Sequence, residues 1–314
     1  MAVVPVNPGP PPMTAPFDRG AMLLRLFSIV SPILICAAIG YAWARTGRPF
    51  DTRFVTRLVL TVGAPFLIVS SLANADVDRG ALASLGLAVV CVLAVLALAG
   101  ALILKLLRME IRSYLGSIIF PNTGNMGLPL CLFAFGHEGL SLGLVVFVIV
   151  ALTQFTAGIA LISGEVHPVR TLASPIVWAA AIGAVLLLTG WDLPVWADNT
   201  VGIMAGLTIP LMLLTLGVSL AKLKVRRFSR SLIVAVLRMG LGFGAGMAVS
   251  GIFGLEGAAR GVLILDAAMP VAVFNALLAE RYDRAPDEVA GGVVLSTIMS
   301  FLTLPLLLWF LLRV

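Results

Sequence analysis

Long blocks of hydrophobic residues alternate along the chain with short polar connections. A transmembrane helix needs about 20 mostly apolar residues to cross a hydrocarbon core about 30 Å thick. Ten blocks of roughly that length follow one another with no polar domain between them. They run over Leu23–Ala44, Phe54–Ala73, Leu82–Leu107, Tyr114–Gly136, Leu140–Ser163, Pro175–Gly190, Gly202–Ala221, Leu232–Gly254, Ala259–Ala279 and Val289–Leu312. The pattern therefore predicts an all-α integral membrane protein with ten transmembrane helices.

The composition places the chain in a lipid bilayer. Of its 314 residues, 60% are hydrophobic and only 11% are charged, and its mean hydropathy is +1.10. Soluble domains are about 45–50% apolar and about 25% charged, so this chain has too few polar groups to cover a water-facing surface. Its net charge of +6 could suggest a nucleic acid partner. Basic residues of membrane proteins gather in cytoplasmic loops instead, so we expect the bilayer as a partner and no nucleic acid.

The basic residues are unevenly divided between the two sets of loops. Of the 21 lysines and arginines, fourteen lie in loops or at helix ends on one side of the ten-helix arrangement and five on the other, while Arg57 and Arg238 are not assigned to either side. Because cytoplasmic loops carry the basic excess, both termini are expected outside the cytoplasm. Short loops and the lack of a visible organelle signal favour a bacterial inner (plasma) membrane.

The chain divides into a tail and two halves. Residues 1–21 are rich in proline and predict a disordered tail. Residues 22–164 and 174–314 each hold five predicted helices and form one membrane domain. Because each half has an odd number of helices, the second half would be inverted relative to the first. Ala64-Pro65-Phe66-Leu67 in the second helix and Ile209-Pro210-Leu211-Met212 in the seventh support such a repeat, which is a recurring architecture of transporters.

The fourth predicted helix contains a segment that cannot be regularly helical. Two prolines, two glycines and two asparagines occur within the nine residues from Pro121 to Pro129. Each proline removes a backbone donor and costs roughly 3 kcal/mol in a helix interior. The segment is therefore expected to unwind at mid-membrane, where protein or a polar cavity must satisfy its backbone.

The ninth helix has a similar interruption at the matching position of the second half. It carries Pro270 at its centre, with Asp266 before it and Asn275 after it. Interrupted helices at matching positions of two halves indicate a transport site. The alternative is a pair of kinked helices whose asparagines only satisfy neighbouring backbone groups.

An anion is the ligand that such breaks favour. Pro129 and Pro270 are predicted at the first turn of a new half-helix, where a missing N–H costs little. The N-termini of these half-helices would present free N–H groups and partial positive charge at mid-membrane. Asn122, Asn125 and Asn275 could add side-chain amide donors.

At these residues the sequence resembles the auxin efflux carrier family, which includes plant auxin exporters and bacterial organic-acid permeases. Two stretches carry the resemblance, Asn122-Thr-Gly-Asn-Met-Gly-Leu-Pro129 and Ala268-Met-Pro-Val-Ala-Val-Phe-Asn-Ala-Leu-Leu-Ala-Glu-Arg-Tyr282. It implies two inverted five-helix repeats, with a scaffold domain and a transport domain in which broken helices 4 and 9 cross. It also implies secondary active transport of small organic anions such as malate, malonate or auxin-like acids, by an elevator-like alternating-access motion. The candidate substrate-binding residues are Asn122, Gly124, Asn125, Gly127, Pro129, Pro270 and Asn275.

Three further polar residues lie at predicted membrane depth and are candidates for coupling or gating. Arg238 could contact the substrate or a gate, or its side chain could extend to the membrane surface as an anchor. Asp266 could bind a coupling proton or cation, or it could cap the broken helix. Gln154 could border the site, or it could form a helix–helix hydrogen bond.

Other functions fit the sequence less well. We expect no enzyme, cofactor or metal site, because both histidines fall in predicted loops and no cluster of ligands lies at membrane depth. An ATP-driven pump is disfavoured because no Gly-x-x-x-x-Gly-Lys loop occurs. An anion channel and a transporter of a non-carboxylate solute stay open as alternatives. A second copy of the chain is a further candidate partner, because large scaffold surfaces often pair, although no motif demonstrates a homodimer.

Overall fold

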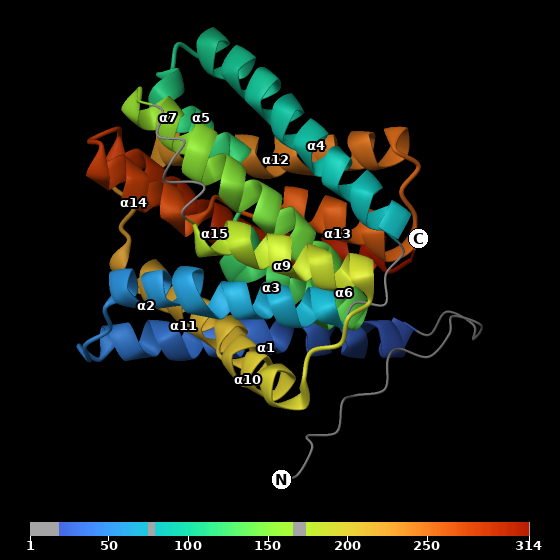
Figure 1. Ribbon diagram of the computed structural model, residues 1–314. Coiled ribbons are helices and arrows are strands. Elements are labelled where there is room, and N and C mark those ends of the chain that lie inside the picture. Colours follow the sequence, from blue (N-terminus) through green and yellow to red (C-terminus); the bar gives the residue numbers. More distant parts are fainter. Residues whose placement is uncertain (1–18, 75–78, 166–173, 314) are drawn as a thin grey trace.

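A computed structural model describes residues 19–74, 79–165 and 174–313, and in these ranges the regular structure is helical (Figure 1). The elements are α1 (Arg19–Arg45), α2 (Thr52–Leu58), η1 (Val59–Gly63), α3 (Ala64–Ala73), α4 (Arg79–Leu106), α5 (Ile111–Ile119), η2 (Thr123–Gly127), α6 (Leu128–Thr153), η3 (Gln154–Gly158), α7 (Ile159–Ser163), α9 (Pro175–Thr189), α10 (Val195–Gly206), α11 (Thr208–Lys222), α12 (Phe228–Ile252), α13 (Gly257–Ala267), α14 (Val273–Arg281) and α15 (Pro286–Leu311). The three η elements are π-helical turns. Most of the expected tail, residues 1–18, lies outside the described residues, while residues 19–21 already belong to α1.

Seven helices in the described ranges are long and apolar enough to cross a membrane. One of them, Thr123–Ser163, spans 41 residues but is interrupted at Gly136, whose φ of 69° and ψ of −153° are not helical. The helix Pro175–Thr189 is shorter, and the predicted fourth and ninth helices are each broken into two pieces. The structure thus establishes a helical protein with several candidate spans, while the count of ten and the inverted repeats stay predictions.

The seventh predicted helix begins earlier than expected and is bent. Helix α10 begins at Val195 rather than at Gly202, and the chain bends at Leu207 before α11 begins. Pro210 explains the bend, because its ring has no N–H for the carbonyl of Gly206 and clashes with it.

The helices pack in two groups. Helix α1 packs along α11, and α3 packs against α9 and α10. Helix α12 contacts α13, α15, α4 and α5. Figure 1 shows α1, α3, α10 and α11 on one side of the molecule and α4, α5 and α12 on the other. The η2–α6 segment contacts both groups. It meets the first through α11, α1 and α3 and the second through α13 and α4, so the broken helices border the seam between them.

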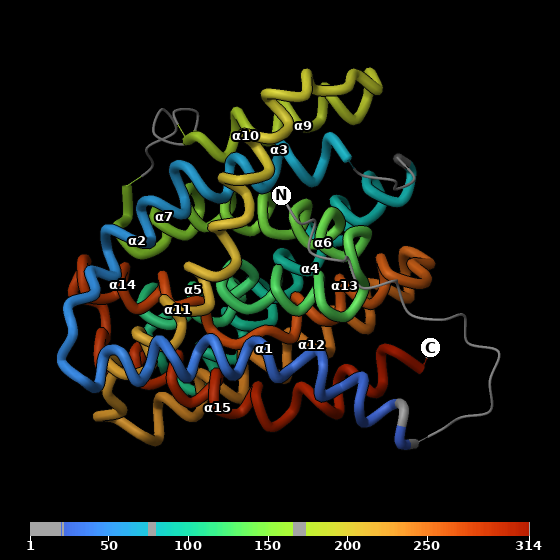
Figure 2. Tube along the Cα trace, turned by 90° about the horizontal axis from the view of Figure 1, so that it is seen from below, coloured from blue at the N-terminus to red at the C-terminus, as the bar shows by residue number. Residues whose placement is uncertain are grey.

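The two ends of the described chain lie on the same side of the molecule. Figures 1 and 2 both show the start of α1 and the end of α15 at one edge of the helix layer. A chain that begins and ends on one side of a layer crosses it an even number of times, which is consistent with the predicted topology.

Candidate substrate site at the helix crossing

The first break begins just before Pro121. The residue before a proline is disfavoured in the helical conformation, and Phe120, just before Pro121, is extended with φ −97° and ψ 107°. Helix α5 therefore ends at Ile119, and the chain becomes helical again at Thr123. In the second half α13 ends at Ala267, shortly before Pro270, and α14 begins at Val273.

The two non-helical segments cross and pair with each other. Pro121 and Val271 form an isolated antiparallel bridge. The N–H of Asn122 donates to the carbonyl of Pro270 at 2.8 Å, and the N–H of Ala272 donates to the carbonyl of Phe120 at 3.3 Å. This pairing satisfies backbone groups that could find no partner in lipid. The predicted breaks are confirmed, and each break supplies the partner of the other.

The predicted positions of the two prolines need correction. Pro270 does not occupy the first turn of a half-helix, because it lies in the extended crossing segment and α14 begins three residues later. Pro129 is in the first turn of α6, but the half-helix already starts at Thr123 as the π-helical turn η2. For Pro270 the physical reason is that pairing with the first crossing segment holds the backbone extended as far as Ala272. For Pro129 it is that the helix resumes directly after the short paired segment, six residues before the proline.

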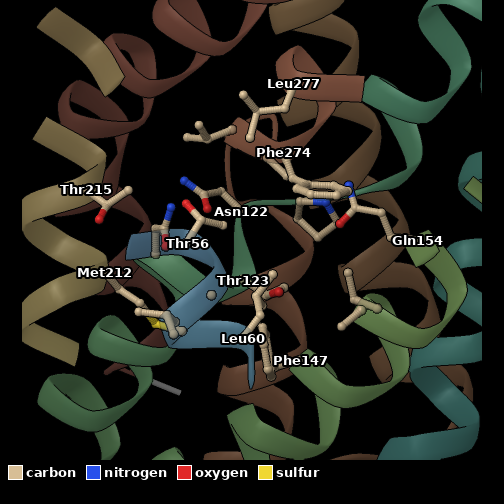
Figure 3. A pocket seen from close by; sticks show the side chains of 18 of the residues that line it. Thr56, Leu60, Asn122, Thr123, Phe147, Gln154, Met212, Thr215, Phe274 and Leu277 are labelled. Carbon is tan, nitrogen blue, oxygen red and sulfur yellow. The ribbon is translucent and has the colours of Figure 1, made fainter. Parts of the chain in front are cut away.

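A cavity of about 80 Å³ lies beside the crossing (Figure 3). This volume is several times the roughly 10–15 Å³ that one water requires. Elements α2, η1 and α11 line it on one side, and the crossing, α6, η3 and α14 line it on the other. The lining residues are Thr56, Val59, Leu60, Pro121, Asn122, Thr123, Gly124, Asn125, Phe147, Val150, Ala151, Gln154, Phe155, Met212, Thr215, Ala272, Val273, Phe274 and Leu277.

The cavity holds unused hydrogen-bond donors. The side chain of Asn122 is only 4% exposed, and its Nδ2 has no hydrogen-bond partner within the described ranges. Thr215 is 3% exposed, and its Oγ1 likewise has no partner there. Figure 3 shows Thr56, Asn122 and Thr215 on one side of the cavity and Gln154 on the other. An unpaired buried donor costs roughly 1–3 kcal/mol, so these groups are suited to a ligand with acceptor atoms.

Two half-helix N-termini border the same cavity. Thr123, Gly124 and Asn125 open the η2–α6 half-helix, and Val273 and Phe274 open α14. Neither N-terminus has a side-chain cap. First-turn N–H groups and the helix dipole favour negative charge, so each of these N-termini presents partial positive charge beside the cavity.

The three π-helical turns of the described chain all contribute to the cavity lining. Leu60 comes from η1, Asn125 from η2 and Gln154 from η3. Such turns are frequent at functional sites because they redirect side chains within a helix. Gly124 provides space there, because a Cβ on this residue would lie 3.2 Å from Cε2 of Phe147.

Asn275 lies beside the cavity rather than on its wall. Its Oδ1 accepts a hydrogen bond from Nε2 of Gln154 at 2.9 Å, and its Nδ2 donates to the carbonyl of Phe120 at 3.3 Å. Gln154 both lines the cavity and makes this interhelical hydrogen bond, so its two predicted roles coexist. Asn275 supports the crossing, and its amide is already engaged.

The remaining candidates do not line this cavity. Pro129 and Pro270 are buried nearby, and Gly127 faces Asp266, whose Oδ1 would lie 2.0 Å from a Cβ placed on that glycine. Asp266 is fully buried, and its Oδ2 accepts a weak hydrogen bond from the Cys131 thiol at 3.6 Å. No helix-capping contact of the Asp266 side chain is found in the described part of the chain.

Arg238 does not anchor at the membrane surface. Its side chain is fully buried on α12, so the alternative in which it extends to the interface is wrong. The physical reason is that backbone carbonyls at the crossing bind the guanidinium inside the protein.

Two wider depressions adjoin the cavity at one end. One, of about 500 Å³, shares Val273 and Leu277 with the cavity, and its charged lining residues are Asp51, Arg53, Lys222 and Glu280. The other, of about 640 Å³, shares Thr56, Leu60, Phe274 and Leu277 and contains Arg53, Arg57, Glu280 and Arg281. A third depression, near Asn74 and His137, shares no lining residue with the cavity. Together the two depressions that adjoin the cavity are lined by four basic and two acidic residues, so this approach to the cavity has a net positive charge.

Several lining residues were not predicted from the sequence, among them Thr56, Phe147, Thr215 and Phe274. A threonine in an apolar helix usually bonds the carbonyl four residues earlier, so the sequence gives no sign that Thr215 lacks a partner. Among the described residues no three His, Cys, Asp or Glu side chains gather as a metal ion would require. His137 is exposed and directly follows the interruption of α6 at Gly136, and His167 lies outside the described residues.

Comparison with known proteins gives a consistent result. An uncharacterized transporter from Methanothermobacter thermautotrophicus is 27% identical over 292 residues, which cover 88% of this chain and 95% of the relative. An uncharacterized transporter from Methanocaldococcus jannaschii is 25% identical over 204 residues, covering 61% of this chain and 66% of the relative. The family described as membrane transport protein matches residues 26–169 and 161–308. The chain therefore belongs to this family of multi-pass membrane transporters, which is the auxin efflux carrier family that the sequence resembles.

Proposed function

We propose that the protein is a secondary active transporter that binds a small organic anion in the cavity at the helix crossing. The family places the chain among membrane transporters, and the proposal adds the solute class and the site. The observation that carries it is the Asn122 amide, whose Nδ2 is buried and unpaired beside two uncapped helix N-termini. A carboxylate could accept hydrogen bonds from all three sources at once.

The remaining lining residues restrict the class of solute that the cavity would bind. The cavity has a mainly apolar wall, made by Phe147, Phe155, Met212 and Phe274. Within the described ranges, no lysine, arginine or histidine lines it. A second carboxylate would have no cation to compensate its desolvation there. We therefore favour an acid with one carboxylate and an apolar body, such as an auxin-like acid, over the dicarboxylates malate and malonate.

The surroundings support alternating access. The cavity lies at the seam of the two helix groups, so relative movement of the groups would change the way it opens. Arg53, Lys222 and Arg281 surround the depressions at one end, and their positive field would raise the local concentration of an anion. By the predicted topology this end is cytoplasmic, so the arrangement corresponds to an inward-facing state.

Ligand-dependent thermal stabilisation of the purified protein tests the proposal. The panel contains indole-3-acetate, malonate, malate and the neutral indole-3-acetamide. Binding to the native state raises stability by RT ln(1 + [L]/Kd), about 2.7 kcal/mol at a hundredfold excess over Kd. We expect stabilisation by indole-3-acetate, less by the two dicarboxylates, and loss of the effect in Asn122→Ala.

Asn199→Ala is the matched control, because Asn199 is an exposed asparagine on α10. It should leave the ligand-induced shift unchanged. Equal stabilisation by the acid and its neutral amide would contradict anion recognition. Currents through single molecules in a planar bilayer, in place of saturable uptake into vesicles, would point to a channel.

A further inference from the structure

Arg238 is a fully buried arginine that the candidate site does not use. It lies in the middle of α12, and its side chain is 0% exposed. No acidic side chain of the described chain forms an ion pair with it. Burying a guanidinium without a carboxylate is costly, so its partners must be other acceptors.

Those partners are the final carbonyls of both first half-helices. Nη1 of Arg238 donates to the carbonyl of Ile119 at 2.9 Å and also to that of Ile118, at the end of α5. Nη2 donates to the carbonyl of Ala267, the last residue of α13. Helix ends leave such carbonyls without partners and carry partial negative charge. One planar cation thus bridges two helix C-termini with separate nitrogens.

The face of α12 is shaped for this approach. Gly242 and Gly246 follow Arg238 at intervals of four residues, which places all three on one face of the helix. A Cβ on Gly242 would lie 2.0 Å from the Ala267 carbonyl oxygen and 2.4 Å from Nη2 of Arg238. A Cβ on Gly246 would lie 3.0 Å from Cβ of Ala267. These glycines let α12 approach the end of α13 closely enough for the guanidinium to reach it.

We infer that Arg238 is a positioning residue that joins the C-terminal ends of α5 and α13 and thereby holds the two crossing segments in register. Phe120 follows directly after the Ile119 carbonyl that Arg238 binds, and its own carbonyl accepts from Ala272 across the crossing. The guanidinium also offsets the negative helix ends, so that the positive N-termini dominate the field at the cavity. Arg238 has this role without contacting the solute, and α12 is expected to move together with the crossing.

Hydrogen exchange of the purified protein in lipid nanodiscs, without any solute, tests this role. In Arg238→Met the segments 118–127 and 266–276 should exchange faster by on the order of tenfold, because the loss of charge-assisted hydrogen bonds favours local opening. The α1 and α11 segments, which pack on each other in the other helix group, should keep their wild-type exchange. Arg238→Lys keeps the charge on a single nitrogen and should recover part of the protection.

Arg230→Met is the matched control, because Arg230 lies two turns earlier on α12 with 62% of its side chain exposed. It should leave exchange at the crossing unchanged. If Arg238→Met does not fold, Gly242→Ala displaces the same guanidinium and should produce the same local increase. Wild-type exchange at the crossing in a folded variant, or an equal increase in α1 and α11, would overturn the inference. Because no solute is present, this result is independent of the proposed transport function.

Discussion

The two broken helices use the same residue types for different purposes. In the first break Asn122 follows Pro121, and its amide nitrogen is left unpaired at the cavity. At the second break Asn275 lies five residues after Pro270, in the first turn of α14, and its amide is hydrogen-bonded to Gln154 and to the carbonyl of Phe120. A proline and an asparagine near a break therefore do not by themselves define a ligand contact. What separates the two asparagines is whether a neighbour already satisfies the amide.

The largest expected effect of this difference is on stability at the second break. Asn275→Ala leaves the Gln154 amide without this partner, which costs roughly 1–3 kcal/mol for a buried donor. It also removes one of the two hydrogen bonds to the Phe120 carbonyl, worth about 0.5–1.5 kcal/mol, while the bond from the Ala272 N–H remains. We expect the free energy of unfolding to fall by about 2–4 kcal/mol in the absence of solute. Thermal unfolding of the purified variant measures this effect. Wild-type stability of Asn275→Ala would show that the hydrogen bonds to Asn275 contribute little to the crossing.

Asn122 should show the opposite balance. Asn122→Ala removes an amide nitrogen that has no partner among the described residues, so stability without solute should change by less than about 1 kcal/mol. A hydrogen bond to a charged acceptor is worth about 1.5–3 kcal/mol, so the affinity for a bound carboxylate should fall roughly tenfold to a hundredfold. Ligand titration of the thermal shift measures the affinity. Asn122→Asp is the sharper variant, because a carboxylate there would repel the anion.

The breaks themselves could be predicted from the sequence, and the different roles of their asparagines could not. Pro121 and Pro270 remove backbone donors wherever they occur in a helix, so the interruptions follow from local chemistry. The pairing of Asn275 with Gln154 joins residues 121 positions apart. Likewise, Arg238 reaches carbonyls at Ile119 and Ala267 that only the tertiary fold brings together. Such contacts leave no pattern in the local sequence. For the same reason, the lack of a partner for Thr215 among the described residues could not be predicted.

A second asymmetry concerns the ends of the first half-helices. Asp266 lies one residue before the end of α13, whereas Ile118 occupies the same place in α5. A buried carboxylate without a cation is costly. Asp266→Asn replaces it with a neutral side chain of the same shape, so the free energy of unfolding should change by less than about 1 kcal/mol. If Asp266 carries a coupling proton, this variant should also lose the pH dependence of uptake. Initial uptake rates into vesicles between pH 5.5 and about 8 test it.

Asp266→Ala is the control for that experiment, because it removes the carboxyl group and also leaves a void beside Gly127. It should lower stability where Asp266→Asn does not. Strong destabilisation by Asp266→Asn would instead indicate that the ionised carboxylate is needed for the fold. An unchanged pH profile in a stable Asp266→Asn protein would remove Asp266 from the coupling mechanism.

The smallest expected effect separates two glycines of the first break. A Cβ added to Gly124, at the cavity, would lie 3.2 Å from a ring atom of Phe147, which can move slightly. A Cβ added to Gly127 would lie 2.0 Å from an oxygen of Asp266. Gly124→Ala should therefore fold normally, and in a helical segment the lower backbone entropy of alanine offsets part of the steric cost. Its extra methyl group narrows the cavity next to the Phe147 ring and Met212. We expect affinity to fall a few-fold, roughly 1 kcal/mol, for an acid with a ring and to stay nearly constant for acetate. Equal losses for both acids would mean that the carboxylate, rather than the apolar body, lies against Phe147, and this outcome would reverse the orientation of the solute at the crossing.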